Sequence, residues 1–137
     1  MSYVLDSSFC GAFILPDEKS TEVSAFFETI ADNSVCHVPS LFWYEISNLL
    51  NTAIRRKRIS SSDIQDLLNI IPHSKIFTDT RAGKEYTELI TNLAFEYNLS
   101  SYDSAYLELA IHKDAMIGTL DENLSKVCVK AGLKIVF

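Results

Sequence analysis

Residues 99–110 read Leu-Ser-Ser-Tyr-Asp-Ser-Ala-Tyr-Leu-Glu-Leu-Ala, which combines a helix start, an almost wholly apolar helix body and one acid. Ser100 or Ser101 can cap a helix that begins here, because a serine hydroxyl accepts a hydrogen bond from a backbone N–H of the first turn. From Tyr102 onward, apolar residues cover most of the helix circumference. The remaining polar stripe, which is expected to face water, consists of Ser104, Glu108 and His112. A helix with so little polar surface is expected at the centre of a domain.

One acid, Asp103, lies at the start of this helix. Taken alone, it is best explained as the partner of Ser100 in a capping box, where each side chain bonds the backbone N–H of the other residue. Its charge also complements the positive end of the helix dipole. A chemical role for Asp103 therefore requires other acids that arrive at the same place.

Length and composition predict one domain that spans residues 1–137. An apolar content of 47% is enough for a substantial core. The first residues lack the basic and long apolar regions of a secretory signal, and no apolar run is long enough to cross a bilayer, so a soluble, cytoplasmic protein without a membrane partner is expected. The cysteines, which form no C-x-x-C pair and are expected to be reduced and buried, are Cys10, Cys36 and Cys128.

The net charge of -6 argues against a nucleic-acid partner, since phosphate binding normally needs a basic surface. The distribution of charge weakens that argument, because bound divalent cations would neutralise acids at the ends of apolar segments. A basic run offers weak candidates for RNA contact in Arg55, Arg56 and Arg58. A solvated helix end explains these arginines at least as well.

Short apolar segments alternate with helical segments along the rest of the chain. Strands are expected at residues 3–5, 35–38, 75–78, 115–119 and 134–137. Helices other than the central one are expected at residues 7–14, 18–32, 41–56, 64–71, 83–97 and 120–132. This alternation predicts an α/β fold, in which right-handed crossovers join parallel strands and helices cover both faces of the sheet.

Two further acids follow strands in this scheme. Asp6 ends the first strand and Asp121 follows the fourth, and ligands of open α/β sheets bind at that edge. An N-cap for the next helix explains Asp6 equally well when it is considered alone. A capping box formed by Thr119 and Glu122 would start the last helix and leave Asp121 without a structural role.

Glu45 differs from these acids because it lies on an apolar helix face beside Leu41, Phe42 and Leu49. Burial of an unpaired carboxylate is strongly unfavourable, so an ion pair, protonation or a metal ion is required. Function is therefore the better explanation for Glu45. If all four acids meet, their all-oxygen ligands suit Mg²⁺ or Mn²⁺. The side chains expected to hydrogen-bond and orient these acids are Ser7, Ser8, Asn48 and Thr119.

Four motifs carry a resemblance to a known family: Val-Leu-Asp6-Ser-Ser, Pro-Ser-Leu-Phe-Trp-Tyr-Glu45-Ile-Ser-Asn-Leu-Leu, the quoted stretch around Asp103, and Gly-Thr-Leu-Asp121-Glu-Asn-Leu. In order and spacing they resemble the PIN-domain family, and most of all the VapC-type ribonuclease toxins of prokaryotic toxin–antitoxin pairs. The resemblance covers essentially the whole chain.

The resemblance implies a three-layer α/β/α sandwich with a mostly parallel sheet of about five strands. It also implies an endoribonuclease that uses Mg²⁺ or Mn²⁺, associates as a homodimer or larger oligomer, and is inhibited by a small antitoxin. The metal-site acids implied are Asp6, Glu45, Asp103 and Asp121, of which the last occupies a position that varies in the family. Asp6 and Asp103 would ligate the principal ion, Glu45 would be a ligand or orient water, and Asp121 would complete the site.

Two alternatives remain. One is a catalytically inactive PIN-like module that acts by binding a partner, and retention of metal affinity would distinguish it. The other is a phospho-acceptor domain of flavodoxin-like topology, against which the absence of a conspicuous lysine at a late strand end argues.

Overall fold

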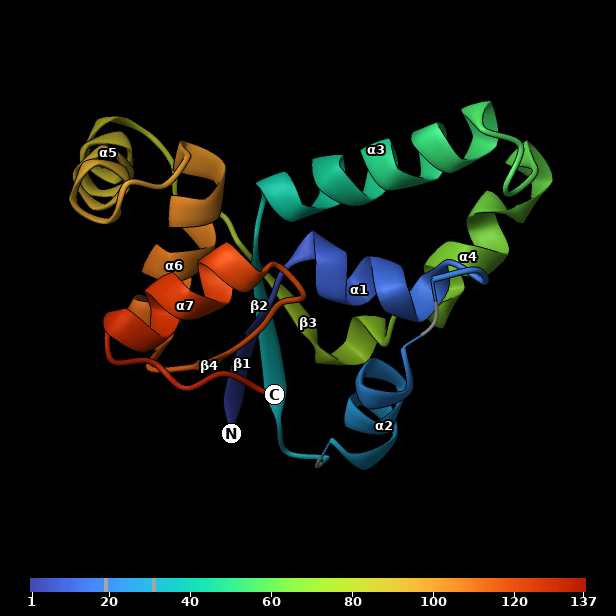
Figure 1. Cartoon of the computed structure of the whole chain (residues 1–137), viewed down its shortest axis with the longest axis horizontal. Coiled ribbons are helices and arrows are strands. Elements are labelled where there is room, and N and C mark those ends of the chain that lie inside the picture. The colour runs from blue at the N-terminus through green and yellow to red at the C-terminus, as the bar shows by residue number, and fades with distance from the viewer. Residues whose placement is uncertain (19, 31) are drawn as a thin grey trace.

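The computed structural model describes residues 1–18, 20–30 and 32–137, and it contains a four-stranded parallel sheet at its centre (Figure 1). The strand order is β3-β2-β1-β4. The strands are β1 (Ser2–Leu5), β2 (Val35–Pro39), β3 (Ile76–Asp79) and β4 (Met116–Gly118). All three pairings are parallel, so the carboxyl ends of the strands share one edge of the sheet.

Helices cover both faces of this sheet. The helices are α1 (Ser7–Ile14), α2 (Thr21–Thr29), α3 (Leu41–Arg55), α4 (Ile64–Ile70), α5 (Lys84–Tyr97), α6 (Ser101–Lys113) and α7 (Glu122–Lys130). Figure 1 shows α1, α2 and α4 on one side of the sheet, α5, α6 and α7 on the other, and α3 running from the sheet edge above α1. The predicted parallel α/β fold is confirmed.

Two expected elements differ in extent. The helix expected at residues 18–32 is the shorter α2, which Ser20 caps; Lys19 and Ala31 lie outside the described residues. The strand expected at residues 134–137 is reduced to one bridge between Ile117 and Ile135, flanked by two backbone hydrogen bonds of 2.9 Å. The sheet of the described chain therefore has four strands rather than five.

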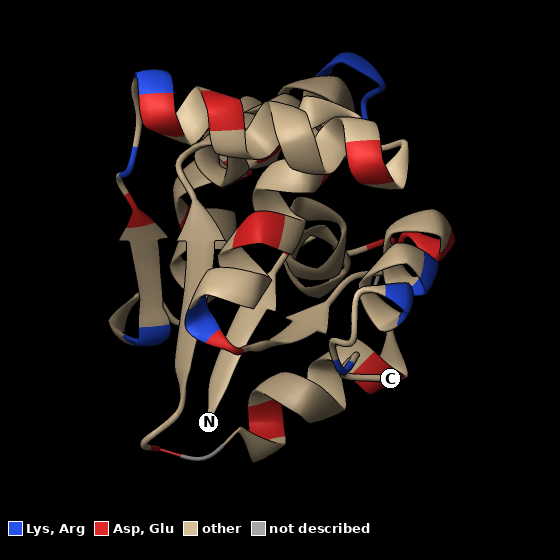
Figure 2. Cartoon of the chain, turned by 90° about the vertical axis from the view of Figure 1, so that its left-hand side faces the viewer, with Lys and Arg blue, Asp and Glu red and all other residues tan. Residues whose placement is uncertain are grey.

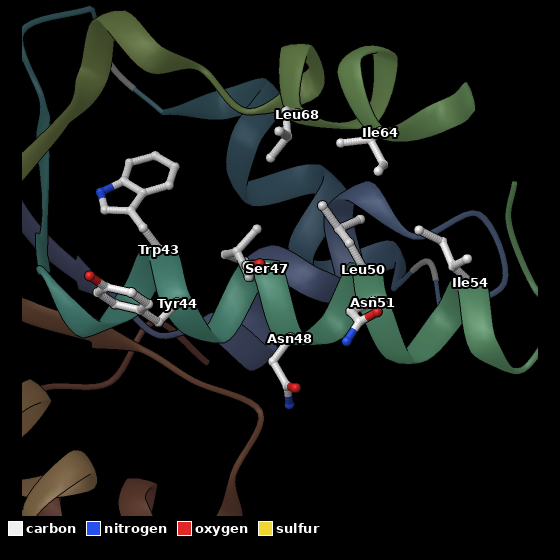
Figure 3. A pocket seen from close by; sticks show the side chains of 10 residues that line it. Trp43, Tyr44, Ser47, Asn48, Leu50, Asn51, Ile54, Ile64 and Leu68 are labelled. Atoms are coloured by element: carbon white, nitrogen blue, oxygen red, sulfur yellow. The ribbon is translucent and has the colours of Figure 1, made fainter. Parts of the chain in front are cut away.

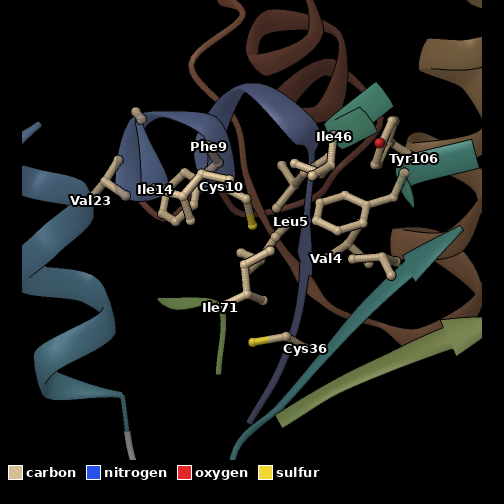
Figure 4. Close-up of a cluster of buried hydrophobic side chains, with 14 of the residues drawn as sticks. Val4, Leu5, Phe9, Cys10, Ile14, Val23, Cys36, Ile46, Ile71 and Tyr106 are labelled. Carbon is tan, nitrogen blue, oxygen red and sulfur yellow. The ribbon is translucent and has the colours of Figure 1, made fainter. Parts of the chain in front are cut away.

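The core lies where α1, α3 and α6 meet β1 (Figure 4). Its largest buried side chains include Phe9, Phe42 and Tyr106, and each such residue contributes about 1.5–3 kcal/mol by leaving water. All three cysteines are buried and free, as expected. In the part of the chain that is described, no helix has both the length and the apolar character needed to cross a membrane.

The expected water-facing stripe of α6 is wrong at two of its three positions. Ser104 is 0% exposed and Glu108 is 5% exposed, whereas Tyr102 and Ile111 on the same helix are 67% and 45% exposed. The reason is that α6 packs against β1 and β2 and also against α5, so almost its whole central circumference is covered. The Arg81 guanidinium pairs with Glu108 and makes burial of that carboxylate tolerable.

Candidate functional site

Asp6 directly follows β1 and is 5% exposed. Its Oδ1 accepts hydrogen bonds from the Ser8 hydroxyl (2.7 Å) and from the backbone N–H of Phe9 (2.9 Å), and the second bond makes Asp6 the N-cap of α1. Its Oδ2 accepts a hydrogen bond from the Thr119 hydroxyl. Asp6 thus serves as a helix cap and is also available to a site, so the two interpretations of the sequence are compatible.

The backbone beside Asp6 is fixed by β4. The backbone N–H of Asp6 donates to the carbonyl oxygen of Gly118 at 3.0 Å. A Cβ at position 118 would lie 2.8 Å from Cδ2 of Leu5 and 3.1 Å from the Phe9 ring, which is too close for an ordinary contact. Glycine therefore allows the Leu5 and Phe9 side chains to pack directly over the end of β4, beside the acids.

Glu45 lies near the start of α3 and is half-buried. Its Oε1 accepts a hydrogen bond of 2.5 Å from the hydroxyl of Tyr106, which is 2% exposed. Figure 4 shows the Tyr106 ring at the margin of the core, with its hydroxyl beside α3. Ser7 is a further hydrogen-bonding neighbour of both Glu45 and Tyr106. Sequence reasoning assigned Tyr106 to the apolar helix body, although a buried tyrosine hydroxyl normally needs a partner.

Asp103 lies in the first turn of α6, and its backbone N–H donates to the Ser100 hydroxyl at 3.1 Å. This is half of the expected capping box: the Ser100 hydroxyl also hydrogen-bonds the Asp103 carboxylate, but among the described hydrogen bonds that carboxylate accepts none from the backbone N–H of Ser100. The Asp103 carboxylate is half-buried and remains available to the site.

Asp121 is exposed and caps α7, because its Oδ1 accepts from the backbone N–H of Leu124 at 2.9 Å. The expected capping box of Thr119 and Glu122 is therefore wrong. The Thr119 hydroxyl bonds Asp6 instead, and it accepts from the backbone N–H of Asp121 at 3.0 Å.

The four acids influence one another electrostatically. Burial raises the pKa of Asp6, and the negative charge of Asp121 raises it further, while the hydroxyls that bond Asp6 oppose the change. Burial likewise raises the pKa of Glu45, with a contribution from Asp6 and Asp103. Burial is also the main cause of the raised pKa of Asp103, followed by the charges of Asp121 and Asp6. Four elements thus bring four carboxylates close enough to repel one another.

This group suits a hard divalent cation by its chemistry. All four side chains offer carboxylate oxygens, the preferred ligands of Mg²⁺ and Mn²⁺. None of the ion pairs formed by described residues includes any of the four. In their present rotamers, however, no three His, Cys, Asp or Glu side chains of the described residues are grouped tightly enough to hold an ion. A divalent ion would therefore require the less buried carboxylates to rotate.

The other expected site residues divide into two sets. Ser7, Ser8 and Thr119 contact the acids as described above, whereas Asn48 makes no hydrogen bond to them within the described chain. Asn48 instead lines a hollow of about 280 Å³ together with Glu45 and Ser7. Its amide sits one helical turn from Glu45 on the exposed side of α3, which explains why spacing alone suggested a direct contact.

The basic run lies at the opposite end of α3 from Glu45. Arg55 lies ten positions after Glu45, which is about 15 Å along a helix. Arg58 donates to Asp17 at 2.6 Å and 2.7 Å and pairs with Glu18 at 3.0 Å, so its charge is already compensated. Arg55 and Arg56 are exposed.

A second hollow, of about 530 Å³, separates α3 from α4 and is mainly apolar. Figure 3 shows Leu50 and Ile54 of α3 pointing toward Ile64 and Leu68 of α4, whereas Asn48 points to the other side of α3. The two faces of α3 therefore present different surfaces, one apolar and one adjoining the acids.

A family model described as PIN domain matches residues 3–130. The chain belongs to the PIN-domain family. This PIN domain is 25% identical over 129 residues to Ribonuclease VapC3 of Pyrobaculum aerophilum, and the match covers 92% of this chain and 94% of the relative.

The fold is shared with solved structures, including the two that follow. The crystal structure of PAE2754 from Pyrobaculum aerophilum has a TM-score of 0.72 and 20% identity, covering 99% of this PIN domain and 84% of that chain. A chain in the crystal structure of VapBC2 from Rickettsia felis, bound to a DNA fragment from their promoter, has a TM-score of 0.71 and 16% identity. The match covers 98% of this PIN domain and 97% of that chain.

Proposed function

We propose that this PIN domain is a metal-dependent endoribonuclease and the toxin of a toxin–antitoxin pair. The observation that carries the proposal is the group of four carboxylates, Asp6, Glu45, Asp103 and Asp121, which come from four elements and form no described ion pair. Mutual repulsion in such a group is relieved by a divalent cation. The likeness to Ribonuclease VapC3 supports RNA as the substrate.

In this proposal Asp6 and Asp103 hold the principal Mg²⁺ or Mn²⁺ ion, and Asp121 completes the site. The ion, when bound, supplies a Lewis acid that stabilises negative charge on the phosphoryl oxygens during hydrolysis. Glu45 either holds the ion or accepts a proton from the attacking water.

The neighbours of the acids keep those carboxylates in position. Ser8, Thr119 and the Phe9 backbone N–H orient Asp6, and Tyr106 orients Glu45. Hydrogen bonds of this kind to ligating carboxylates fix their rotamers and tune their basicity.

The same proposal includes two protein partners. A small antitoxin protein would inhibit the enzyme, and a second copy of the chain would form a homodimer or larger assembly. Both are supported by the resemblance of the acid motifs to VapC-type toxins rather than by a contact in the structure.

The test is cleavage of a structured RNA pool by the purified chain, free of antitoxin, in Mg²⁺, in Mn²⁺ and in EDTA. Cleavage is expected with either metal, and it should be lost in EDTA and in Asp103→Asn. Asp114→Asn is the matched control, because Asp114 lies at the other end of α6 in a left-handed conformation (φ 49°) that asparagine also adopts. Cleavage by Asp103→Asn at the wild-type rate would refute the assignment.

The second candidate is a PIN-like module that has lost catalysis and acts by binding a partner. The observation that favours it is the absence, in the described rotamers, of three grouped ligands. Calorimetric titration with Mn²⁺ separates the two candidates, because only the nuclease requires an ion at Asp6 and Asp103.

A further inference from the structure

We propose that Tyr44 and Tyr102 form a subsite that binds one unpaired nucleobase of a single-stranded RNA, next to the four acids. This inference rests on the proposed nuclease function and adds to it the part of the substrate that the protein recognises. It concerns a hollow beside the acids rather than the acids themselves.

The two tyrosines belong to different elements but line the same hollow of about 280 Å³. Tyr44 directly precedes Glu45 on α3, and Tyr102 directly precedes Asp103 on α6. Glu45 itself lines this hollow. A nucleotide whose phosphate lies at the acids therefore has its neighbouring base within reach of both rings.

Both rings are unusually exposed for aromatic side chains. Tyr44 is 79% exposed and Tyr102 is 67% exposed, so neither contributes its ring to the core. Aromatic side chains carry a large apolar area, and exposing it to water is unfavourable. A planar base that stacks on such a ring removes part of this area from water and gains stacking energy, whatever its identity.

The remaining lining of the hollow favours a base over a protein side chain. The Asn48 amide offers both donors and an acceptor, whereas the Ser7 hydroxyl is already hydrogen-bonded to Glu45 and Tyr106. Unpaired RNA bases present donors and acceptors on exposed edges, and proteins recognise them by combining these hydrogen bonds with aromatic stacking. The hollow between α3 and α4 also carries aromatic and amide side chains, but none of the four acids lines it.

The charge of the chain limits the RNA affinity that phosphate contacts can supply. The net charge is -6, and acidic residues extend to the exposed surface of α5, as Figure 2 shows. Phosphate contacts with basic side chains supply most of the affinity of typical nucleic-acid-binding proteins. Since the exposed Arg55 and Arg56 lie at the far end of α3, stacking on bases must supply a larger share of RNA affinity here.

Tyr102 is the sharper position to test, because Tyr44 and Asn48 also line the hollow between α3 and α4. The binding measurement uses fluorescence anisotropy with a fluorescein-labelled single-stranded RNA 12-mer pool in Mg²⁺. The background is Asp103→Asn, which is expected to bind without cleavage. Tyr102→Leu keeps an apolar side chain but loses the ring, and Tyr102→Phe keeps the ring but loses the hydroxyl.

Tyr102→Leu is expected to weaken binding by about 5- to 100-fold, the range for loss of one stacked base, and Tyr102→Phe by less than about twofold. Phe95→Leu is the matched control: Phe95 is 90% exposed, on α5, and should leave binding unchanged. Binding of a fully paired RNA duplex of the same sequences should be insensitive to Tyr102→Leu.

Three results would overturn the subsite. The first is that the Asp103→Asn background does not detectably bind single-stranded RNA. The second is that Tyr102→Leu and Phe95→Leu weaken RNA binding equally. The third is that Tyr102→Leu changes the oligomeric state in sedimentation velocity but does not change RNA binding. The last result would mean that a second copy of the chain covers the ring.

Cleavage by the wild-type chain is measured separately and tests the proposed function. If the wild-type chain cleaves RNA but Tyr102→Leu does not weaken RNA binding, the subsite alone is refuted. Binding that depends on Tyr102 without metal-dependent cleavage refutes the nuclease and retains the subsite.

Discussion

The Thr119 hydroxyl donates a hydrogen bond to Oδ2 of Asp6, so the residue after β4 orients the acid that ends β1. The same hydroxyl oxygen accepts from the backbone N–H of Asp121 at 3.0 Å. Thr119 therefore links two acids that are 115 positions apart in the chain, and its loss affects both ends of the site.

Thr119→Val keeps the shape of the side chain but removes the hydroxyl. It should lower the free energy of unfolding by about 1–3 kcal/mol at pH 7, because a buried carboxylate loses a donor. Since the Thr119 hydroxyl lowers the pKa of Asp6, the variant should also raise that pKa. Urea unfolding measures the first effect. Thr119→Ser retains the hydroxyl and is expected to remain near wild type, and an equally large loss in that control would contradict the explanation.

Tyr106→Phe removes the donor that bonds Glu45. This hydrogen bond lowers the pKa of Glu45, so its loss should raise that pKa and move the acid limb of the pH–rate profile to higher pH. Metal affinity or activity should fall by about 10- to 100-fold, as for other groups that orient metal ligands. Cleavage rates between pH 5 and 8 measure the shift. Tyr97→Phe, on α5, is the control, and an unchanged acid limb in Tyr106→Phe would refute this role.

Stability should depend on pH and metal together. Burial and mutual repulsion raise the folded-state pKa of Asp6, Glu45 and Asp103 above their unfolded values. Carboxyl groups of this kind stabilise the fold below their unfolded pKa of about 4, and this contribution is lost as pH rises through the folded values. Without metal, Asp103→Asn should therefore raise the melting temperature at pH 7 but not at pH 4.

At pH 7, a bound divalent metal ion should restore the stability that repulsion among the ionised acids removes. At a metal concentration of about 100 times the dissociation constant, the expected gain is about 2.7 kcal/mol. Thermal melts in Mn²⁺ and in EDTA at pH 5 to 8 give the measurement. A metal site would be contradicted if Mn²⁺ did not change the melting temperature of the wild-type chain at any pH in this range.

Arg81 connects β3 with α6, since it donates to Asp79 at 3.1 Å and to Glu108 at 3.2 Å. Arg81→Met leaves the buried Glu108 carboxylate without its partner and should cost about 1.5–3 kcal/mol. The lower end is expected because the Arg81 side chain is 32% exposed and solvent screens the pair. Urea unfolding measures this cost. Addition of Glu108→Gln should recover part of it, and no recovery would show that Arg81 acts by packing alone.

Arg58→Met is the control for this measurement. Arg58 also pairs with two carboxylates, but both are at the surface, so its replacement should have a much smaller effect than that of Arg81. Equal losses for the two variants would contradict the assignment of the Arg81 effect to Glu108.

Local patterns predicted the strands and helices well, because period-two and helical spacing survive in segments such as β2 and α3. The meeting of Asp6 and Asp121 at one edge followed from parallel topology. The Tyr106 contact with Glu45 spans 61 positions, and that of Arg81 with Glu108 spans 27, so neither left a local signal. The pairing with Arg81 also explains why Glu108 is buried, although its place on the polar stripe of the helix predicts a surface position.

Three of the four acids also stand where helices begin. Asp6 and Asp121 are the N-caps of α1 and α7, and Asp103 lies in the first turn of α6. Each helix directs its positive end, about half an elementary charge, at its own acid. Alanine at Asp6 or Asp121 would fray a helix as well as remove a proposed metal ligand, whereas asparagine keeps the cap and removes the charge. If the proposed catalysis is correct, a lineage that loses it through asparagine at Asp6 or Asp121 is expected to keep the fold, which then remains available for binding a partner.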